Sequence, residues 1–223
     1  MAAAPATPAL PLLWGRNNLP VPYAARWSAE RAAMRGVLTV RPDGRGLAYR
    51  DEAPADRDRH GVLWARLTEA QGEGRPDFGS LHTVRQRRAM FDMLCQVCGG
   101  PASRTSRGWL FLVQRPETAE ESADWPEGLL STKPPVCEPC AALAARYCPH
   151  LTDPVAVRVR KPRVWGVFGG FVVPDADGGL VPSPDDHTLP YGHSAACWFL
   201  ASQLVIELTR CWSACEPFGM VGA

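Results

Sequence analysis

Four cysteines arranged as two CxxC pairs constrain the fold of this chain more than any other feature. The pairs are Cys95-Gln-Val-Cys98 and Cys137-Glu-Pro-Cys140. Two residues between cysteines allow one tight turn to aim both sulfur atoms at a single point, and four thiolates satisfy the tetrahedral coordination that Zn²⁺ prefers. We therefore predict one structural zinc site with Cys95, Cys98, Cys137 and Cys140 as its ligands.

The residues around both pairs fit this interpretation. Gly99 and Gly100 follow the first pair and allow the backbone to approach the thiolates closely. The second pair opens a predicted helix over residues 138–147, where Pro139 suits the first turn and the helix N-terminus stabilises thiolate charge. A strand is predicted over residues 109–113, between the pairs. The order of turn, strands and helix is similar to that of a treble-clef zinc finger.

Two other interpretations of the cysteine pairs remain open. A pair of disulfide bridges would require an oxidising compartment, and the first residues lack the basic segment of a secretion signal. A redox-active CxxC motif is typical of a βαβ unit, and no such pattern surrounds either pair. The spacing and the context favour zinc over both.

Composition and charge limit the function classes. Charged residues make up 21% of the 223 positions and hydrophobic residues 46%, which is typical of a globular chain. No apolar run approaches the roughly 20 residues of a membrane helix, so we expect a cytoplasmic protein without membrane contact. The net charge is +2 over residues 1–81, +4 over residues 82–163 and −5 over residues 164–223. The cysteine region is therefore mildly basic, which is weaker than the usual footprint of a nucleic-acid-binding protein.

The pattern along the chain predicts an α+β fold, with antiparallel strands and a few helices around the zinc site. We expect a β-rich N-terminal region over residues 1–79 and a zinc-stapled region over residues 80–223, joined by the linker-like residues 71–79. One integrated domain is the alternative. The N-terminal region is predicted to contain a helix over residues 29–35 capped by Ser28, and strands over residues 37–41, 47–51 and 62–67.

Two further helices are predicted in the C-terminal region. A helix over residues 81–94, capped by Ser80, would lead the chain directly into Cys95. Residues 194–210 are apolar around most of a helical circumference, which is typical of a helix buried in a core or an interface. A homo-oligomer formed through this C-terminal helix is therefore one expectation.

Basic side chains near the cysteines suggest a nucleic-acid-binding surface. Three arginines lie on the helix that precedes Cys95, and the alternating strand over residues 155–159 continues into a second basic stripe. The candidate residues are Arg85, Arg87, Arg88, Arg158, Arg160, Lys161 and Arg163. A solvated helix face is the competing interpretation, and a protein partner accounts for the small net charge at least as well. The leading hypothesis is thus a zinc-stabilised binding or adaptor protein, with a nucleic acid or a protein as its partner.

An enzyme with its active site away from the zinc is the runner-up hypothesis. His60, His82 and Asp58 are the residues that such a site would use. No phosphate-binding loop with a Gly-Lys-Ser/Thr ending is present. A zinc deaminase would need a histidine-glutamate motif before a Cys-x-x-Cys pair. His82 is followed by Thr83 and Val84, so this motif is absent.

Arg87-Arg88 leading into Cys95-Gln-Val-Cys98-Gly99 resembles the cysteine-bearing members of the HNH nucleases, which implies a related zinc scaffold. No histidine lies between Cys98 and Cys137 and no asparagine follows Asn18, so the resemblance does not imply the nuclease activity. The chain also resembles uncharacterised actinobacterial zinc-knuckle proteins, some labelled phage-related, which implies one integrated domain and no known chemistry. The stretches that carry this second resemblance are residues 15–20 (GRNNLP), 57–64 (RDRHGVLW), 94–99 (LCQVCG) and 148–151 (CPHL).

Overall fold

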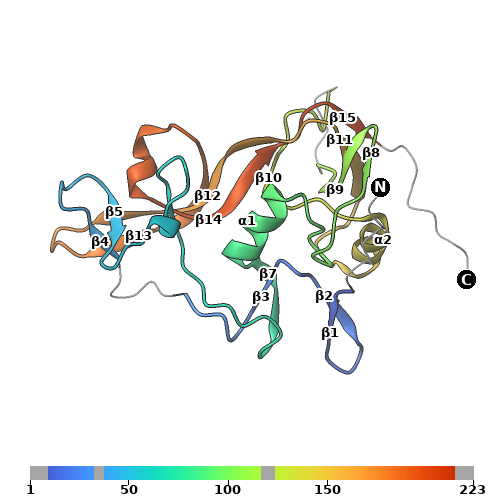
Figure 1. Cartoon of the computed structure of the whole chain (residues 1–223), viewed down its shortest axis with the longest axis horizontal. Helices are drawn as coiled ribbons and strands as arrows, with labels where there is room; N and C mark the ends of the chain where they lie inside the picture. Colours follow the sequence, from blue (N-terminus) through green and yellow to red (C-terminus); the bar gives the residue numbers. More distant parts are fainter. Residues whose placement is uncertain (1–9, 33–37, 117–123, 214–223) are drawn as a thin grey trace, which may run out of the picture.

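The structure of this chain is a computed structural model that describes residues 10–32, 38–116 and 124–213. Over these residues the fold is α+β, as predicted, with many strands and two α-helices. The molecule is elongated, and the long strands β12 and β14 run from the half that contains the cysteines toward the opposite end (Figure 1). Helix α1 lies between the two ends.

The larger sheet is built on one apolar strand, β14, which pairs with a neighbour on each side. It consists of β10 (Leu130–Ser131), β14 (Phe199–Glu207), β12 (Arg163–Pro174) and β13 (Leu180–Pro190) in that order, and β6 (Leu63–Trp64) pairs with β14 in parallel. Gly166 and Gly169 have no room for a Cβ, because one would lie 2.1 Å from the Leu189 carbonyl oxygen and the other 2.2 Å from the Leu200 carbonyl oxygen.

The smaller sheet carries the cysteine cluster on one face. It consists of β15 (Cys211–Ser213), β11 (Pro154–Val159), β9 (Gly108–Gln114) and β8 (Arg104–Thr105) in that order, all antiparallel. The strands predicted over residues 109–113 and 155–159 are confirmed as β9 and β11. Strand alternation sends Phe111 and Val157 into the main core and Leu110 and Ala156 toward the cysteines.

The main core lies between the two sheets and under helix α1 (Thr83–Phe91). Phe111 and Val157 meet Phe199 and Leu204 of β14 there, together with Met90 of α1. These side chains are at most 1% exposed, so the apolar surface that they remove from water is the main stabilising contribution.

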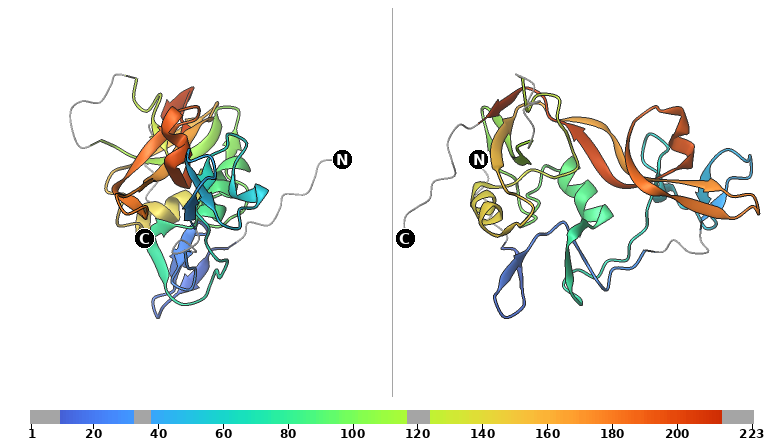
Figure 2. Two further views of the ribbon diagram at one scale, coloured as in Figure 1. Left: turned by 90° about the vertical axis from the view of Figure 1, so that its left-hand side faces the viewer. Right: turned by 180° about the vertical axis from the view of Figure 1, so that it is seen from behind.

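Three two-stranded antiparallel sheets complete the fold. They are β1 (Leu12–Trp14) with β2 (Leu19–Val21), β3 (Ala25–Trp27) with β7 (Pro76–Leu81), and β4 (Leu38–Val40) with β5 (Leu47–Tyr49). The strands predicted over residues 37–41 and 47–51 are confirmed as the third sheet, which is a hairpin. The first two sheets project side by side from the same edge of the molecule (Figure 2).

The prediction of a C-terminal helix was wrong. Only the short 3-10 helix η2 (Ser194–Trp198) is helical there, and the chain continues as β14. A strand that is buried on both faces reads as a continuous apolar run, which periodicity cannot distinguish from a buried helix. Phe199 and Leu204 face the main core, whereas Leu200 packs with Leu47 and Leu63 on the other side. The basis for a homo-oligomer through an apolar helix is therefore lost.

Two other elements differ from the prediction. Helix α1 begins at Thr83 with His82 as its N-cap, not after Ser80, because residues up to Leu81 belong to β7. Strand β7 also occupies the end of the linker-like residues 71–79. The helix predicted over residues 29–35 is absent over residues 29–32, which form a turn and a bridge from Ala32 to Leu67; residues 33–35 lie outside the described part of the chain. The strand predicted over residues 62–67 is limited to β6.

Candidate metal centre

The first half of the candidate centre is a tight turn that follows α1. Two backbone hydrogen bonds close it: the Cys95 N–H donates to the Gly100 carbonyl at 2.7 Å, and the Gly99 N–H donates to the Cys95 carbonyl at 2.9 Å. Gly99 has a φ of 72°, and a Cβ there would lie 2.8 Å from the Tyr23 ring. Glycine is therefore required at this position both by the left-handed backbone and by the packing of Tyr23.

The second half is the N-terminus of helix α2 (Glu138–Tyr147), whose bounds match the prediction. Cys137 is the N-cap residue, and its carbonyl accepts from the Ala141 N–H at 2.9 Å. Pro139 lies in the first turn, where its missing N–H costs nothing. Cys137 and Cys140 therefore present their sulfur atoms at the positive end of the helix dipole, which favours thiolates.

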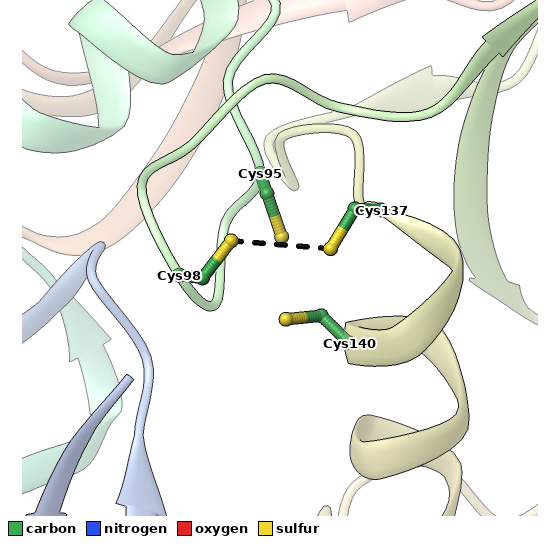
Figure 3. A group of neighbouring side chains, drawn as sticks. All are labelled: Cys95, Cys98, Cys137 and Cys140. Carbon is green, nitrogen blue, oxygen red and sulfur yellow. Dashed lines mark hydrogen bonds between the residues drawn. The ribbon is translucent and has the colours of Figure 1, made fainter. Parts of the chain in front are cut away.

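The four sulfur atoms converge on one point (Figure 3). All four lie within 4.8 Å of one another, and the Sγ atoms of Cys98 and Cys137 are 3.9 Å apart. Four thiolates around one tetrahedral ion with metal–sulfur bonds of about 2.3 Å lie roughly 3.8 Å apart, whereas a disulfide requires about 2.0 Å. All four cysteines are free thiols, so the geometry fits a metal ion and not a pair of disulfides.

Hydrogen bonding within the cluster lets one sulfur carry charge. The Cys140 thiol donates to Cys95, and together with nearby backbone N–H groups this lowers the pKa of Cys95 to about 5. The same interaction raises the pKa of Cys140, while burial raises the pKa of Cys98 to about 11. A cation at the centre would replace the shared protons, because metal ions bind the deprotonated thiolate.

The cluster is buried and fastened to the N-terminal segment. Cys95 is 0% exposed, and Cys98 and Cys140 are 8% and 6% exposed. The N–H groups of Tyr23 and Ala24 donate to the carbonyls of the turn, to Val97 at 2.8 Å and to Gln96 at 3.1 Å. Four protein ligands would complete a tetrahedron around an ion at this point, and substrate or water would have no coordination position.

A second group of metal-binding side chains is already occupied by an arginine. Glu30, Glu69 and His82 offer ligand atoms within 4.8 Å of one another. However, the Arg85 guanidinium donates to both Glu30 oxygens at 2.6 and 2.8 Å and to Glu69 at 3.2 Å. It also donates to the Tyr23 and Ala25 carbonyls at 2.8 and 2.7 Å. The Arg85 guanidinium therefore already supplies the positive charge that a metal ion would bring to this group.

The three arginines of α1 do not share one exposed face, because Arg85 is buried. Arg85 is 3% exposed and fully engaged, so its assignment to nucleic acid was wrong; a buried counter-charge for Glu30 explains its place in the sequence. The Arg87 guanidinium lies 4.6 Å from the centre of the Trp64 ring. Arg88 is exposed and lies 3.6 Å from the Asp92 carboxylate, one helical turn away.

The second basic stripe is divided by the structure. Arg158 is paired with Glu138 and also donates to the Ser103 hydroxyl at 3.0 Å, so it fastens β11 to the start of α2. Arg160, Lys161 and Arg163 lie where β11 passes into β12, and they are exposed. Of these three, only Arg163 has an ion-pair partner among the described residues, the Glu207 carboxylate at 3.4 Å.

Three further arginines, which were not predicted from the sequence, lie beside the connection between β11 and β12. Strand pairing places Trp109 opposite both Arg104 and Val159, and the Arg160 N–H donates to the Arg210 carbonyl at 3.2 Å. We call the resulting group the basic junction. It consists of Arg104, Arg107, Arg160, Lys161, Arg163 and Arg210. The register between β8, β9, β11 and β15 brings them together, and no local spacing in the sequence indicates it.

The candidate catalytic residues are held in structural contacts. The Asp58 carboxylate accepts from the Tyr191 hydroxyl at 2.7 Å and from the Trp64 indole at 3.0 Å. The His60 ring stacks on the Tyr191 ring with centroids 3.8 Å apart. Burial, and then the hydrogen bond to Asp58, raise the pKa of Tyr191. His82 lies elsewhere, buried at the start of α1. The structure therefore brings Asp58 and His60 together but separates them from His82.

No family model, curated protein or solved structure matches this chain. Among residues 10–32, 38–116 and 124–213, no helix is long and apolar enough to cross a membrane.

Proposed function

We propose that this chain is a binding protein whose fold is held by one structural Zn²⁺ and whose partner is a nucleic acid. Zinc is favoured over other metals because four thiolates form a soft, tetrahedral ligand set. Cys95, Cys98, Cys137 and Cys140 would hold the ion, which would supply cross-linking between the turn and α2. A closed set of four ligands supports a structural role and not a catalytic one.

The order of elements supports a treble-clef-like arrangement. The turn with Cys95 and Cys98 is followed by the β8–β9 hairpin, and α2 then delivers the second pair of cysteines. Strand β10 pairs with β14 of the larger sheet, so the segment between the cysteine pairs also ties the metal centre to the rest of the fold.

The observation that carries the proposal is the basic junction. Six cations gather where the two sheets meet, and no carboxylate within 4.0 Å pairs with Arg160, Lys161 or Arg210 among the described residues. Exposed cations without partners attract a polyanion, and each phosphate contact releases counterions into solution. A protein partner with an acidic surface is the competing candidate. It predicts that this chain binds nucleic acid weakly or not at all.

A salt titration tests the proposal. Purified protein with its metal is titrated against fluorescein-labelled 20-nucleotide DNA, single-stranded and duplex, at 50 and 200 mM salt. We expect binding at 50 mM that weakens by about tenfold or more at 200 mM, as expected for several phosphate contacts. Absence of binding to both DNA forms at 50 mM salt would rule out the nucleic-acid partner and leave a protein partner.

A further inference from the structure

A hollow lies at the basic junction, between the connections β11–β12 and β14–β15. Its volume is about 540 Å³, and its lining combines three cations (Lys161, Arg163, Arg210) with three carboxylates (Asp124, Glu127, Glu207), Gly128 and Thr209. Two backbone hydrogen bonds hold the connections together, from the Lys161 N–H to the Thr209 carbonyl at 3.1 Å and from the Arg160 N–H to the Arg210 carbonyl. These bonds hold the backbone of Arg160, Lys161 and Arg210 in place at the point where the two sheets are connected.

Two of the three carboxylates that line the hollow, Glu127 and Glu207, are engaged by groups of the protein. Glu127 accepts from the backbone N–H groups of Arg210 and Cys211 at 2.8 and 2.9 Å, and these bonds lower its pKa. Glu207 is paired with Arg163. Among the described residues, no carboxylate lies within 4.0 Å of the Lys161 or Arg210 side chain, although the charge of Arg210 helps to lower the pKa of Glu127. Lys161 and Arg210 are therefore available to an anion that enters the hollow.

An exposed tryptophan lies two residues after Arg210, one of the residues that line the hollow. Trp212 on β15 is 53% exposed, although tryptophan is usually well buried. The Arg107 guanidinium lies 5.8 Å from the centre of its ring. Trp212 is two residues from Arg210, so their Cα atoms are at most roughly 7 Å apart, and one nucleotide can bring its phosphate to Arg210 and its base toward the indole.

We infer that the basic junction binds single-stranded nucleic acid, with backbone phosphates at Lys161 and Arg210 and a base stacked against Trp212. This inference rests on the proposed function and specifies its ligand. Stacking on an indole requires an unpaired base, because the faces of duplex bases are covered by their neighbours.

The test compares single-stranded 12-nucleotide DNA with the duplex of the same sequence, in the same buffer, for four variants of the full chain. Trp212→Ala should weaken single-strand binding about five- to hundredfold, the range found for loss of one stacked base. The double variant Lys161→Ala/Arg210→Ala should reduce the salt slope by about 1.4, because each lost single-strand phosphate contact removes about 0.7.

Two matched variants control for charge and for surface aromatics. Arg41→Ala/Arg45→Ala removes two cations from the β4–β5 hairpin at the other end of the molecule. Tyr147→Ala removes a 48% exposed ring that also lies near an arginine, Arg146 at 5.3 Å. Both controls should bind like the unmodified protein, and all four variants should retain their metal.

The outcomes separate the inference from the proposed function. Equal affinity for single strand and duplex, or unchanged binding by Trp212→Ala, would overturn the inference and leave the proposed function standing. Loss of binding that is equal in the junction variants and their controls would also overturn it. Absence of salt-dependent binding to either form would overturn both.

Discussion

Two groups of potential metal ligands occur in the part of the chain that the structure describes, and they differ in what neutralises them. Among the described residues, no arginine or lysine side chain donates to any of the four thiols. Glu30, Glu69 and His82 meet around the Arg85 guanidinium, which satisfies both Glu30 oxygens. Convergence of ligand atoms alone therefore does not define a metal site. The difference is whether the fold supplies its own positive charge.

The largest expected effect breaks the thiol cluster. Cys140→Ser removes one of four ligands, and we expect loss of bound metal and unfolding of the turn, the β8–β9 hairpin and α2. Metal binding contributes about 10–16 kcal/mol to folding in small zinc modules, so the loss should exceed that of any other single substitution. Circular dichroism and metal analysis measure both effects. Cys148→Ser, at the other end of the same helix, is the control and should keep metal and fold; an equally folded, metal-loaded Cys140→Ser would contradict the assignment.

Removal of Arg85 tests its role as the counter-charge in the group of Glu30, Glu69 and His82. Arg85→Met leaves Glu30 buried without its partner, and breaking a buried pair in this way costs roughly 3–5 kcal/mol. Arg88→Met on the same helix removes an exposed arginine and should change the free energy of unfolding by less than about 0.5 kcal/mol. Urea denaturation of the two variants measures the difference. Equal stabilities would show that Arg85 is not the counter-charge of this group.

The pH dependence of stability is a smaller effect with a defined sign. Burial, and then the charge of Arg85, lower the pKa of His82 below 6.5, so the unfolded chain takes up a proton that the folded chain excludes. Stability should therefore decrease as the pH falls through 6.5, by at most about 1.4 kcal/mol per pH unit. Burial alone would raise the pKa of Glu30, but hydrogen bonds from Arg85 and the Trp27 N–H lower it; this contribution is present above pH 4.5 and is lost as the pH falls through the folded value.

The His82 contribution can be isolated by substitution. Urea denaturation at pH 7.5 and 5.5, with the metal kept saturating, should show a smaller loss of stability for His82→Gln than for the unmodified protein. An identical loss in both proteins would place the titrating group elsewhere.

The sequence predicted the convergence of the four cysteines because its signal is local. Each CxxC pair sits in one turn, and Pro139 marks the start of α2, so both halves could be identified without knowing what lies next to them. The basic junction could not be predicted, because Arg104, Arg160 and Arg210 become neighbours only through the register of four strands.

The errors have the same physical origin. Residues 199–207 form a strand because both faces are covered by distant elements, and their apolar pattern alone permits a helix. Arg85 is an ordinary exposed position by helical spacing until Glu30, 55 residues away in the sequence, packs against it.

Counting the metal ions bound to each chain tests the central claim most directly. Protein purified with zinc in the medium and then dialysed is analysed for metal content and by native mass spectrometry. One zinc per chain is predicted, because the thiol cluster takes an ion and Arg85 already fills the other group. Less than about 0.2 zinc per chain would contradict the structural metal, and two zinc ions per chain would contradict the role given to Arg85.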